Sequence, residues 1–221
     1  MKKNFLVTVL IFLAGSISVP AMDLSQLPEV GKDYIEIRNG SPLNPADGKI
    51  VVEEFFNYIC PSCNRFESMF ESWIAQLPSY VKVEHVPAAF RPDFVQYARA
   101  YCAAEIFNLA GKTHKAVYVA IHQSHLLPAE GDKPDEARIA EFYSHFGVDA
   151  HKFLATMQSY NVEIKIRRAM QYLQLCKVPS TPAIVINGRY LVRGESYADM
   201  LRIATYLIDK EHAGMQTTRH D

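Results

Sequence analysis

The chain has 221 residues, 23 of them Lys or Arg and 24 Asp or Glu, which gives a formal net charge of −1 at pH 7. This balance, with no basic run, argues against nucleic acid or an anionic membrane surface as the main partner. Four cysteines do not make a disulfide-dense scaffold, so a hydrophobic core must supply most of the stability.

Residues 1–21 have the pattern of a secretory signal peptide. Two lysines precede the apolar stretch from Phe5 to Ala14, and the small residue Ala21 favours cleavage before Met22. The apolar stretch is too short for a permanent membrane helix, and no later segment offers the roughly 20 apolar residues that such a helix needs. We therefore expect a soluble, exported chain in a compartment that permits lasting disulfides.

The first predicted strand covers Ile50 to Phe56, and a predicted helix begins just after Cys60. The strand segment is rich in β-branched and aromatic residues and follows a turn-like stretch. Beyond Cys60, apolar residues recur at spacings of three and four, which is typical of an amphipathic helix. The sequence Cys60-Pro61-Ser62-Cys63 therefore lies where a strand leads into a helix, with Pro61 at a position that tolerates proline.

Further along, the sequence predicts a second strand, a helical block, a hairpin and a last helix. In chain order these are a strand at Val81 to Val86, helical patterns over 94–160, a helix over 161–177, and paired strands at Ala183 to Ile186 and Arg189 to Val192. The Asn-Gly between the paired strands suits a type I′ turn. Ser196 can cap the last helix.

A Cys-x-x-Cys near a strand–helix–strand pattern is typical of a thioredoxin-like redox site. Three segments extend that likeness: E-F-F-N-Y-I-C-P-S-C at 54–63, E-H-V-P at 84–87 and V-P-S-T-P-A-I-V-I-N-G-R-Y at 178–190. With them, the chain resembles the DsbA family of exported thiol:disulfide oxidoreductases over essentially its whole mature length.

The resemblance implies an α/β fold with a mixed sheet, namely a thioredoxin fold with an inserted helical domain. The expected organisation is a signal peptide (1–21), the first part of the thioredoxin-like domain (22–90), the helical insertion (91–177), the second part of the thioredoxin-like domain (178–212) and a disordered polar tail (213–221).

The chemistry of the cysteine pair follows from its place at a helix N-terminus. Unpaired backbone N–H groups and the helix dipole favour the thiolate of Cys60, which makes it the predicted nucleophile. Cys63 lies one turn further on the same face and is the predicted resolving partner. The family commonly has His where this chain has Ser62. A hydroxyl brings no positive charge, so we expect a less oxidising site than Cys-Pro-His-Cys.

Three further residues acquire roles from the resemblance. In the thioredoxin superfamily the proline of the loop before the hairpin is cis and lies beside the cysteine pair, which implies that Pro182 shapes a groove and that Thr181 contacts an extended substrate. The resemblance also implies that Glu54 is a buried acid that tunes the thiols and relays protons. Val83 replaces its usual lysine partner, which predicts a raised pKa for Glu54.

Two alternatives stay open for the remaining cysteines. Cys102 and Cys176 each lie on an apolar helical stripe, as buried inert thiols do. A disulfide between them would close a loop of about 75 residues and add about 4 kcal/mol on the chain-entropy estimate.

A zinc site made from Cys60, Cys63, His122 and His125 is the metal-binding alternative. Histidines three apart on a polar helix are usually surface residues, and a zinc site has no need of the Thr-Pro hairpin. We therefore expect neither a metal nor a cofactor.

Together these features predict a periplasmic, monomeric dithiol oxidase that introduces disulfides into reduced, unfolded secreted proteins through a mixed disulfide. The resemblance implies a quinone-linked membrane partner of the DsbB type that reoxidises the pair. The alternatives are a reductase or isomerase of the same superfamily, a structural zinc module, and a non-enzymatic chaperone or binding domain.

Overall fold

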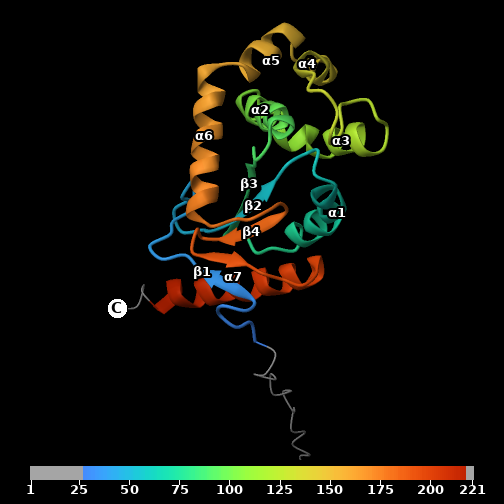
Figure 1. Ribbon diagram of the computed structural model, residues 1–221. Coiled ribbons are helices and arrows are strands. Elements are labelled where there is room, and N and C mark those ends of the chain that lie inside the picture. Colours follow the sequence, from blue (N-terminus) through green and yellow to red (C-terminus); the bar gives the residue numbers. More distant parts are fainter. Residues whose placement is uncertain (1–26, 218–221) are drawn as a thin grey trace, which may run out of the picture.

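A mixed five-stranded sheet lies between helices in the computed structural model, which describes residues 27–217 (Figure 1). The predicted signal peptide lies outside the described residues. The elements are β1 (Tyr34–Glu36), β2 (Ile50–Phe56), α1 (Pro61–Ile74), β3 (Val81–Pro87), α2 (Pro92–Ile106), α3 (Ala110–His122), α4 (Glu136–Ser144), α5 (Ala150–Met157), α6 (Tyr160–Leu175), β4 (Ala183–Ile186), β5 (Tyr190–Val192) and α7 (Tyr197–Thr217).

The strand order is β1-β5-β4-β2-β3. β2 runs parallel to β3, whereas the other neighbouring pairs are antiparallel. The parallel register places Glu54 opposite His85 and Val52 opposite Val83. β2 lies between β4 and β3, and every one of its residues is buried, which explains its nearly continuous apolar sequence. The exceptions are Glu53 and Glu54, which as successive strand residues point to opposite faces of the sheet.

Two hydrophobic cores cover the two faces of the sheet. On one face α1 and α7 pack against β2, β4 and β5, and on the other face α6 does so. Fully burying Phe66 or Phe70, both of α1, contributes roughly 1.5–3 kcal/mol each. The first core contains Ile50 and Val52 of β2, Phe66 and Phe70 of α1, Ile184 and Ile186 of β4, and Ile203, Ala204 and Leu207 of α7.

Helices α2 to α5, with the start of α6, form a third core that lies beyond the end of β2 (Figure 1). This core includes Phe56, Tyr58, Cys60 and Cys63, so the cysteine pair lies where the sheet meets the helical block. No helix among residues 27–217 is both long enough and apolar enough to cross a bilayer.

The predicted mixed α/β architecture with inserted helices is confirmed. The hairpin turn has φ of 53° at Asn187 and 64° at Gly188, as a type I′ turn requires. Ser196 accepts a hydrogen bond from the backbone N–H of Asp199, at 3.2 Å, and so caps α7. The short strand β1 was not predicted, because three residues carry no measurable alternation; it forms only by pairing with β5.

The structure corrects the prediction that a disordered polar tail begins at residue 213. α7 continues to Thr217, and only residues 218–221 lie outside the described range. The physical reason is that Met215 packs against the sheet core, while the Thr217 hydroxyl donates to the carbonyl of Ala213 within the helix. These contacts hold a segment whose composition alone favours disorder.

Candidate active site

A tight, buried turn carries the chain from β2 to Cys60. Asn57 is buried, and its side-chain amide donates to the carbonyls of Ala88, at 2.7 Å, and Phe94, at 3.1 Å. Its side-chain oxygen accepts from the N–H of Ile59 at 3.2 Å. Asn57 thereby fixes the turn to the segment after β3 and to α2. The sequence analysis missed this residue because its partners are distant in the chain.

Cys60 is the N-cap residue of α1, with Pro61 at the first turn. The residue is 7% exposed, whereas Cys63 is fully buried. A hydrogen bond from the Cys63 thiol is the main cause that lowers the pKa of Cys60 to about 5, against an opposing effect of burial. Hydrogen bonds from Thr181 and from the backbone N–H groups of Ser62 and Cys63 lower this pKa further. The thiolate is therefore favoured at neutral pH, as the helix position predicts.

Cys63 has the opposite environment. Its side chain is fully buried, and burial raises the pKa of its thiol well above the usual value. The nearby Cys60 and Glu54 add to the increase. The pair therefore divides into a slightly exposed cysteine that prefers to be a thiolate and a fully buried one that prefers to keep its proton. The nucleophilic role of Cys60 and the resolving role of Cys63 stay predictions, which this division favours.

The loop before β4 lies against the cysteine pair. The Thr181–Pro182 peptide bond is cis, as the resemblance implied. The Cys60 thiol donates to the backbone carbonyl of Thr181, and the sulfur and oxygen atoms are 3.5 Å apart. The structure thus brings Thr181 and Pro182 beside Cys60, although 121 residues separate Thr181 from it in the chain.

The hydroxyl of Ser62 does not serve as the thiolate donor. It accepts a hydrogen bond from the guanidinium of Arg65 at 3.0 Å, and the backbone N–H of Ser62 interacts with the Cys60 sulfur instead. Tyr197 of α7 donates its hydroxyl to the backbone carbonyl of Ser62 at 3.1 Å and packs on Phe66, with ring centroids 5.2 Å apart. Tyr197 therefore holds the first turn of α1. Sequence reasoning missed it, since nothing local marks a tyrosine as a partner of a distant turn.

Glu54 is fully buried, and neither of its carboxylate oxygens has a hydrogen-bond partner. Burial raises the pKa of Glu54 well above its usual value, and Glu67 and Cys60 add to the rise. The direction agrees with the prediction made from the absent lysine. His85 lies closest among the potential cations, with its Nε2 3.4 Å from the Glu54 Oε2, but burial lowers the pKa of His85 to about 3. The imidazole is therefore neutral.

Cys102 and Cys176 lie in different cores. Cys102 belongs to the core of the helical block, and Cys176 belongs to the core between α6 and the sheet. Both thiols are free and buried. The alternative of a Cys102–Cys176 disulfide is thus not realised in this structure, because the two apolar stripes face different elements. The structure contains two separate buried thiols instead.

The zinc set weighed from the sequence is not assembled. His122 of α3 lies with its Nε2 2.7 Å from the backbone carbonyl of Tyr58, and His125 follows the helix at a positive φ of 52°. Within residues 27–217, neither histidine gathers with the cysteine pair into a group that could hold a metal.

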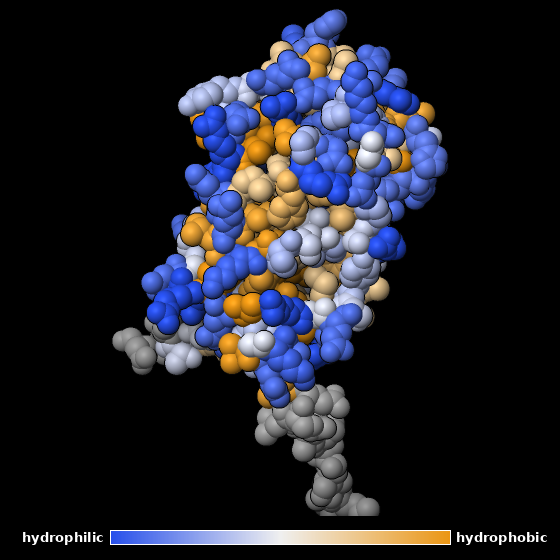
Figure 2. All heavy atoms as spheres, in the orientation of Figure 1, coloured by the Kyte–Doolittle hydropathy of each residue, from blue (hydrophilic) through white to orange (hydrophobic). Residues whose placement is uncertain are grey.

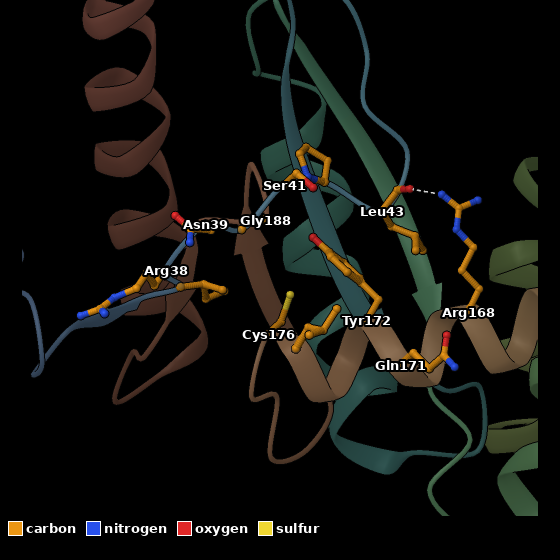
Figure 3. Close-up of a pocket in the computed structure, with 13 residues that line it drawn as sticks. Arg38, Asn39, Ser41, Leu43, Arg168, Gln171, Tyr172, Cys176 and Gly188 are labelled. Atoms are coloured by element: carbon orange, nitrogen blue, oxygen red, sulfur yellow. Dashed lines mark hydrogen bonds between the residues drawn. The ribbon is translucent and has the colours of Figure 1, made fainter.

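A hollow of about 360 Å³ lies apart from the cysteine pair, between the loop after β1 and the C-terminal part of α6 (Figure 3). Tyr172 of α6 and Cys176, which follows the helix, line it together with Ser41 and Gly188. Arg168 donates to the carbonyl of Leu43 at its edge. Tyr172 also donates its hydroxyl to the buried Glu53. None of the predicted redox residues lines this hollow.

Comparison with known proteins agrees with this geometry. The family model of the DSBA-like thioredoxin domain matches residues 51–204. A thiol:disulfide interchange protein DsbA of Pseudomonas aeruginosa is 30% identical over 214 residues, which cover 96% of this chain and 98% of that protein. The corresponding protein of Burkholderia cepacia is 28% identical, with 95% of each chain covered.

Solved structures give the same result. The oxidoreductase DsbA of Xylella fastidiosa superimposes with a TM-score of 0.80 and 40% sequence identity, over 85% of this chain and 99% of that one. The Pseudomonas aeruginosa DsbA structure gives a TM-score of 0.72 at 30% identity, over 84% and 95% of the two chains. The chain belongs to the DSBA-like thioredoxin domain family and is a disulfide oxidoreductase of the DsbA type.

Proposed function

We propose that this protein works as an oxidase, which introduces disulfide bonds into reduced, unfolded proteins after their export. The single observation that carries this direction is the asymmetry of the pair. The pKa of Cys60 is lowered to about 5, whereas that of Cys63 is raised. A stable Cys60 thiolate stabilises the reduced enzyme, and a stable reduced enzyme is a strong oxidant.

The reaction begins with the enzyme's Cys60–Cys63 disulfide. A substrate thiolate attacks the Cys60 sulfur, a substrate–Cys60 bond forms, and the Cys60–Cys63 bond breaks. Its electron pair leaves on Cys63, which takes a proton, as its raised pKa favours. The second substrate thiolate then attacks the substrate sulfur of this mixed disulfide, and Cys60 leaves as a thiolate. The substrate loses two electrons and the enzyme gains them. Cys60 is a fast leaving group in this second step, because its pKa is lowered.

The residues around the pair have distinct parts in this proposal. The carbonyl of Thr181, 3.5 Å from the Cys60 sulfur, marks where an extended peptide could pair with the loop, and Pro182 shapes that edge. The first turn, with Pro61 and Ser62, presents backbone N–H groups to the sulfur. We propose Glu54 as a positioning residue, because its buried carboxylate acts electrostatically on both sulfurs.

The surface supports substrates of little sequence demand. On the face shown in Figure 2, hydrophobic residues form a band between the hydrophilic helical block and the hydrophilic surface near α7. Exposed apolar side chains include Met69 of α1, 43% exposed, and Phe90, 39% exposed, in the segment before α2. Unfolded chains offer apolar side chains and free backbone to such a surface.

The compartment and the partners are part of the proposal. The relatives are thiol:disulfide interchange proteins, and the sequence of residues 1–21 favours export, which supports a periplasmic location for the reaction. Oxidation of substrate leaves the pair reduced, so a further oxidant must accept two electrons per cycle. We propose that a quinone-linked membrane protein of the DsbB type fills this role. The helical segment 91–177 acts as an insertion that supports the site, and the protein works as a monomer.

The test is the redox potential of the Cys60–Cys63 pair at equilibrium with glutathione. An oxidase requires a potential well above the roughly −270 mV of thioredoxin, whereas a value near that of thioredoxin refutes the oxidase direction and favours a reductase. Oxidation of a reduced, unfolded model protein by a stoichiometric amount of enzyme gives the second readout. The variant Cys60→Ser should abolish this transfer.

A further inference from the structure

Four ionisable side chains meet where β2 and β3 face α1 and α3. They are Glu54 of β2, His85 of β3, Glu67 of α1 and His114 of α3. The Nε2 of His85 is 3.4 Å from the Oε2 of Glu54, and the Nε2 of His114 is 3.4 Å from the Oε2 of Glu67. The imidazole centroids of the two histidines are 4.4 Å apart. These contacts join four side chains from four different elements into one cluster.

Four polar atoms of this cluster lack hydrogen-bond partners. Both carboxylate oxygens of Glu54, the Oε2 of Glu67 and the Nε2 of His114 are buried without one. Glu54 is fully buried, Glu67 is 6% exposed and His114 is 7% exposed. Buried polar groups in native proteins nearly always find a partner, so several unpaired groups around one point need an explanation. A positively charged ligand between them would supply the missing partner.

The spacing of the atoms fits a metal ion. One ligand atom each from Glu54, His85 and His114 can be chosen so that all lie within 4.8 Å of one another. In a tetrahedral zinc site with bonds of about 2.0–2.1 Å, the ligand atoms are about 3.4 Å apart. The His85 Nε2–Glu54 Oε2 distance of 3.4 Å matches this edge length, and so does the His114 Nε2–Glu67 Oε2 distance of 3.4 Å if Glu67 is the fourth ligand. Both distances are long for a hydrogen bond.

His114 is oriented as metal-bound histidines usually are. Its Nδ1 lies 3.0 Å from the hydroxyl of Tyr58, which is buried. If Nδ1 carries the proton and donates it to that hydroxyl, the lone pair of Nε2 is directed into the cluster. A hydrogen bond on the far nitrogen is the arrangement that fixes the ring in known metal sites.

We propose that Glu54, His85 and His114 form a binding site for a divalent transition-metal ion, with Zn²⁺ as the preferred occupant. Two imidazoles and one carboxylate are a donor set that zinc proteins use with an open fourth position. The carboxylate of Glu67, beside His114, or a water molecule can take that position. The ion would neutralise a buried carboxylate for which the described residues supply no lysine or arginine.

The cluster is accessible from solvent. A hollow of about 380 Å³ is lined by His85, His114, Glu67, Glu71 and Tyr101, among others, so both proposed histidine ligands border solvent-accessible space, whereas Glu54 is fully buried. His85 keeps 23% of its side chain exposed. The prediction of no metal came from weighing a different set, because the sequence does not reveal that histidines 29 residues apart converge on Glu54.

The test uses the oxidised wild-type protein, whose Cys60–Cys63 disulfide cannot bind metal. Zn²⁺ is titrated by calorimetry, and Co²⁺ is titrated as a spectroscopic probe, because its visible absorption reports four-coordinate nitrogen and oxygen ligation. We expect one ion per chain. Glu54→Gln, His85→Gln and His114→Gln should each weaken binding by at least about tenfold, and Tyr58→Phe should weaken it less.

The matched control is His151→Gln, since His151 of α5 is exposed and outside the cluster. This variant should bind as the wild type does. Thermal unfolding without metal checks that each variant folds, and Glu54→Gln, which keeps the side-chain shape, preserves the test if His114→Gln does not fold. Zn²⁺ should raise the unfolding temperature of the wild type and not that of Glu54→Gln. The proposal is overturned if the oxidised protein binds no ion, or if the folded ligand variants bind Zn²⁺ as tightly as the wild type and His151→Gln do.

Discussion

The Cys60 sulfur lies 3.5 Å from the backbone carbonyl oxygen of Thr181, to which it donates in its protonated form. This contact joins the first turn of α1 to the loop that leads into β4, so the sulfur that exchanges disulfides and the backbone offered to a peptide lie in one place. A side-chain hydrogen bond from Thr181 also lowers the pKa of Cys60. The loop therefore influences the thiol as well as the approach of the substrate.

The lowered pKa of Cys60 predicts a pH dependence of stability. With a folded pKa of about 5 against an ordinary value of 9.0, the thiolate contributes stability that is complete above pH 9 and is lost as the pH falls through about 5. Between pH 5 and 7 only the unfolded chain binds this proton, so the free energy of unfolding rises with pH. The expected rise is about 2 kcal/mol.

Other groups titrate in the same range, so the quantity to measure is the difference between the reduced and the oxidised protein. Urea unfolding of both forms at pH 5 and pH 7 gives it, and the ultraviolet absorbance of the thiolate should titrate with a midpoint near 5. The variant Cys60→Ser should show neither the rise nor the absorbance. A thiolate midpoint near the ordinary value of 9 would contradict the structure.

Replacing Ser62 by histidine should make the pair more oxidising. Position 62 lies in the first turn of α1, where the Ser62 hydroxyl accepts from Arg65 and brings no charge of its own. A protonated imidazole there would attract the Cys60 thiolate and lower its pKa. A decrease of about one pKa unit corresponds to roughly 30 mV in the potential of the two-electron couple. Glutathione equilibria of Ser62→His and of the neutral control Ser62→Asn measure this, and equal potentials for the two variants would refute the charge effect.

Much of the fold could be predicted because its signals are local. The apolar run of β2, the periodicity after Cys60 and the Asn187-Gly188 turn each depend on residues close together in the chain, and all three predictions are confirmed. The strand β1 and the last turns of α7 escaped prediction. Both are held by tertiary contacts, β1 by pairing with β5 and the end of α7 by the packing of Met215.

The residues of the candidate active site also divide into those that a local sequence signal predicts and those that depend on distant contacts. The two cysteines, Thr181 and Pro182 carry recognisable motifs, whereas Asn57, Tyr197 and His114 do not. Each of the latter three acts through a partner far away in sequence, such as the carbonyl of Ser62 for Tyr197, 135 residues apart. A side chain whose role depends on one distant contact has no spacing or periodicity that could reveal it.

The two other cysteines should be unreactive in the folded protein. Burial raises the pKa of Cys102 to about 12 and that of Cys176 to about 11, so their thiolates are scarce at neutral pH. In the reduced native protein, a thiol reagent should therefore modify Cys60 first and leave Cys102 and Cys176 unmodified. Mass mapping after unfolding without reductant should find both labelled. If both resisted labelling until a reductant was added, they would be bridged, contrary to the structure.

Replacing Tyr197 by phenylalanine should weaken the turn that carries the redox pair. The Tyr197 hydroxyl donates to the carbonyl of Ser62 at 3.1 Å, while its ring packs on Phe66. Tyr197→Phe keeps the ring contact and removes the hydrogen bond, which typically contributes about 1 kcal/mol. Because the bond belongs to the turn and not to the sulfur, the free energy of unfolding should fall by about that amount in both redox forms. The redox potential should then change little, since it depends on the difference between the two forms.

Urea unfolding of both forms and glutathione equilibria measure the two quantities. Tyr206→Phe, a partly buried tyrosine on the same helix, is the control. A large shift in potential with unchanged stability would mean that Tyr197 acts on the thiolate and does not merely hold the turn.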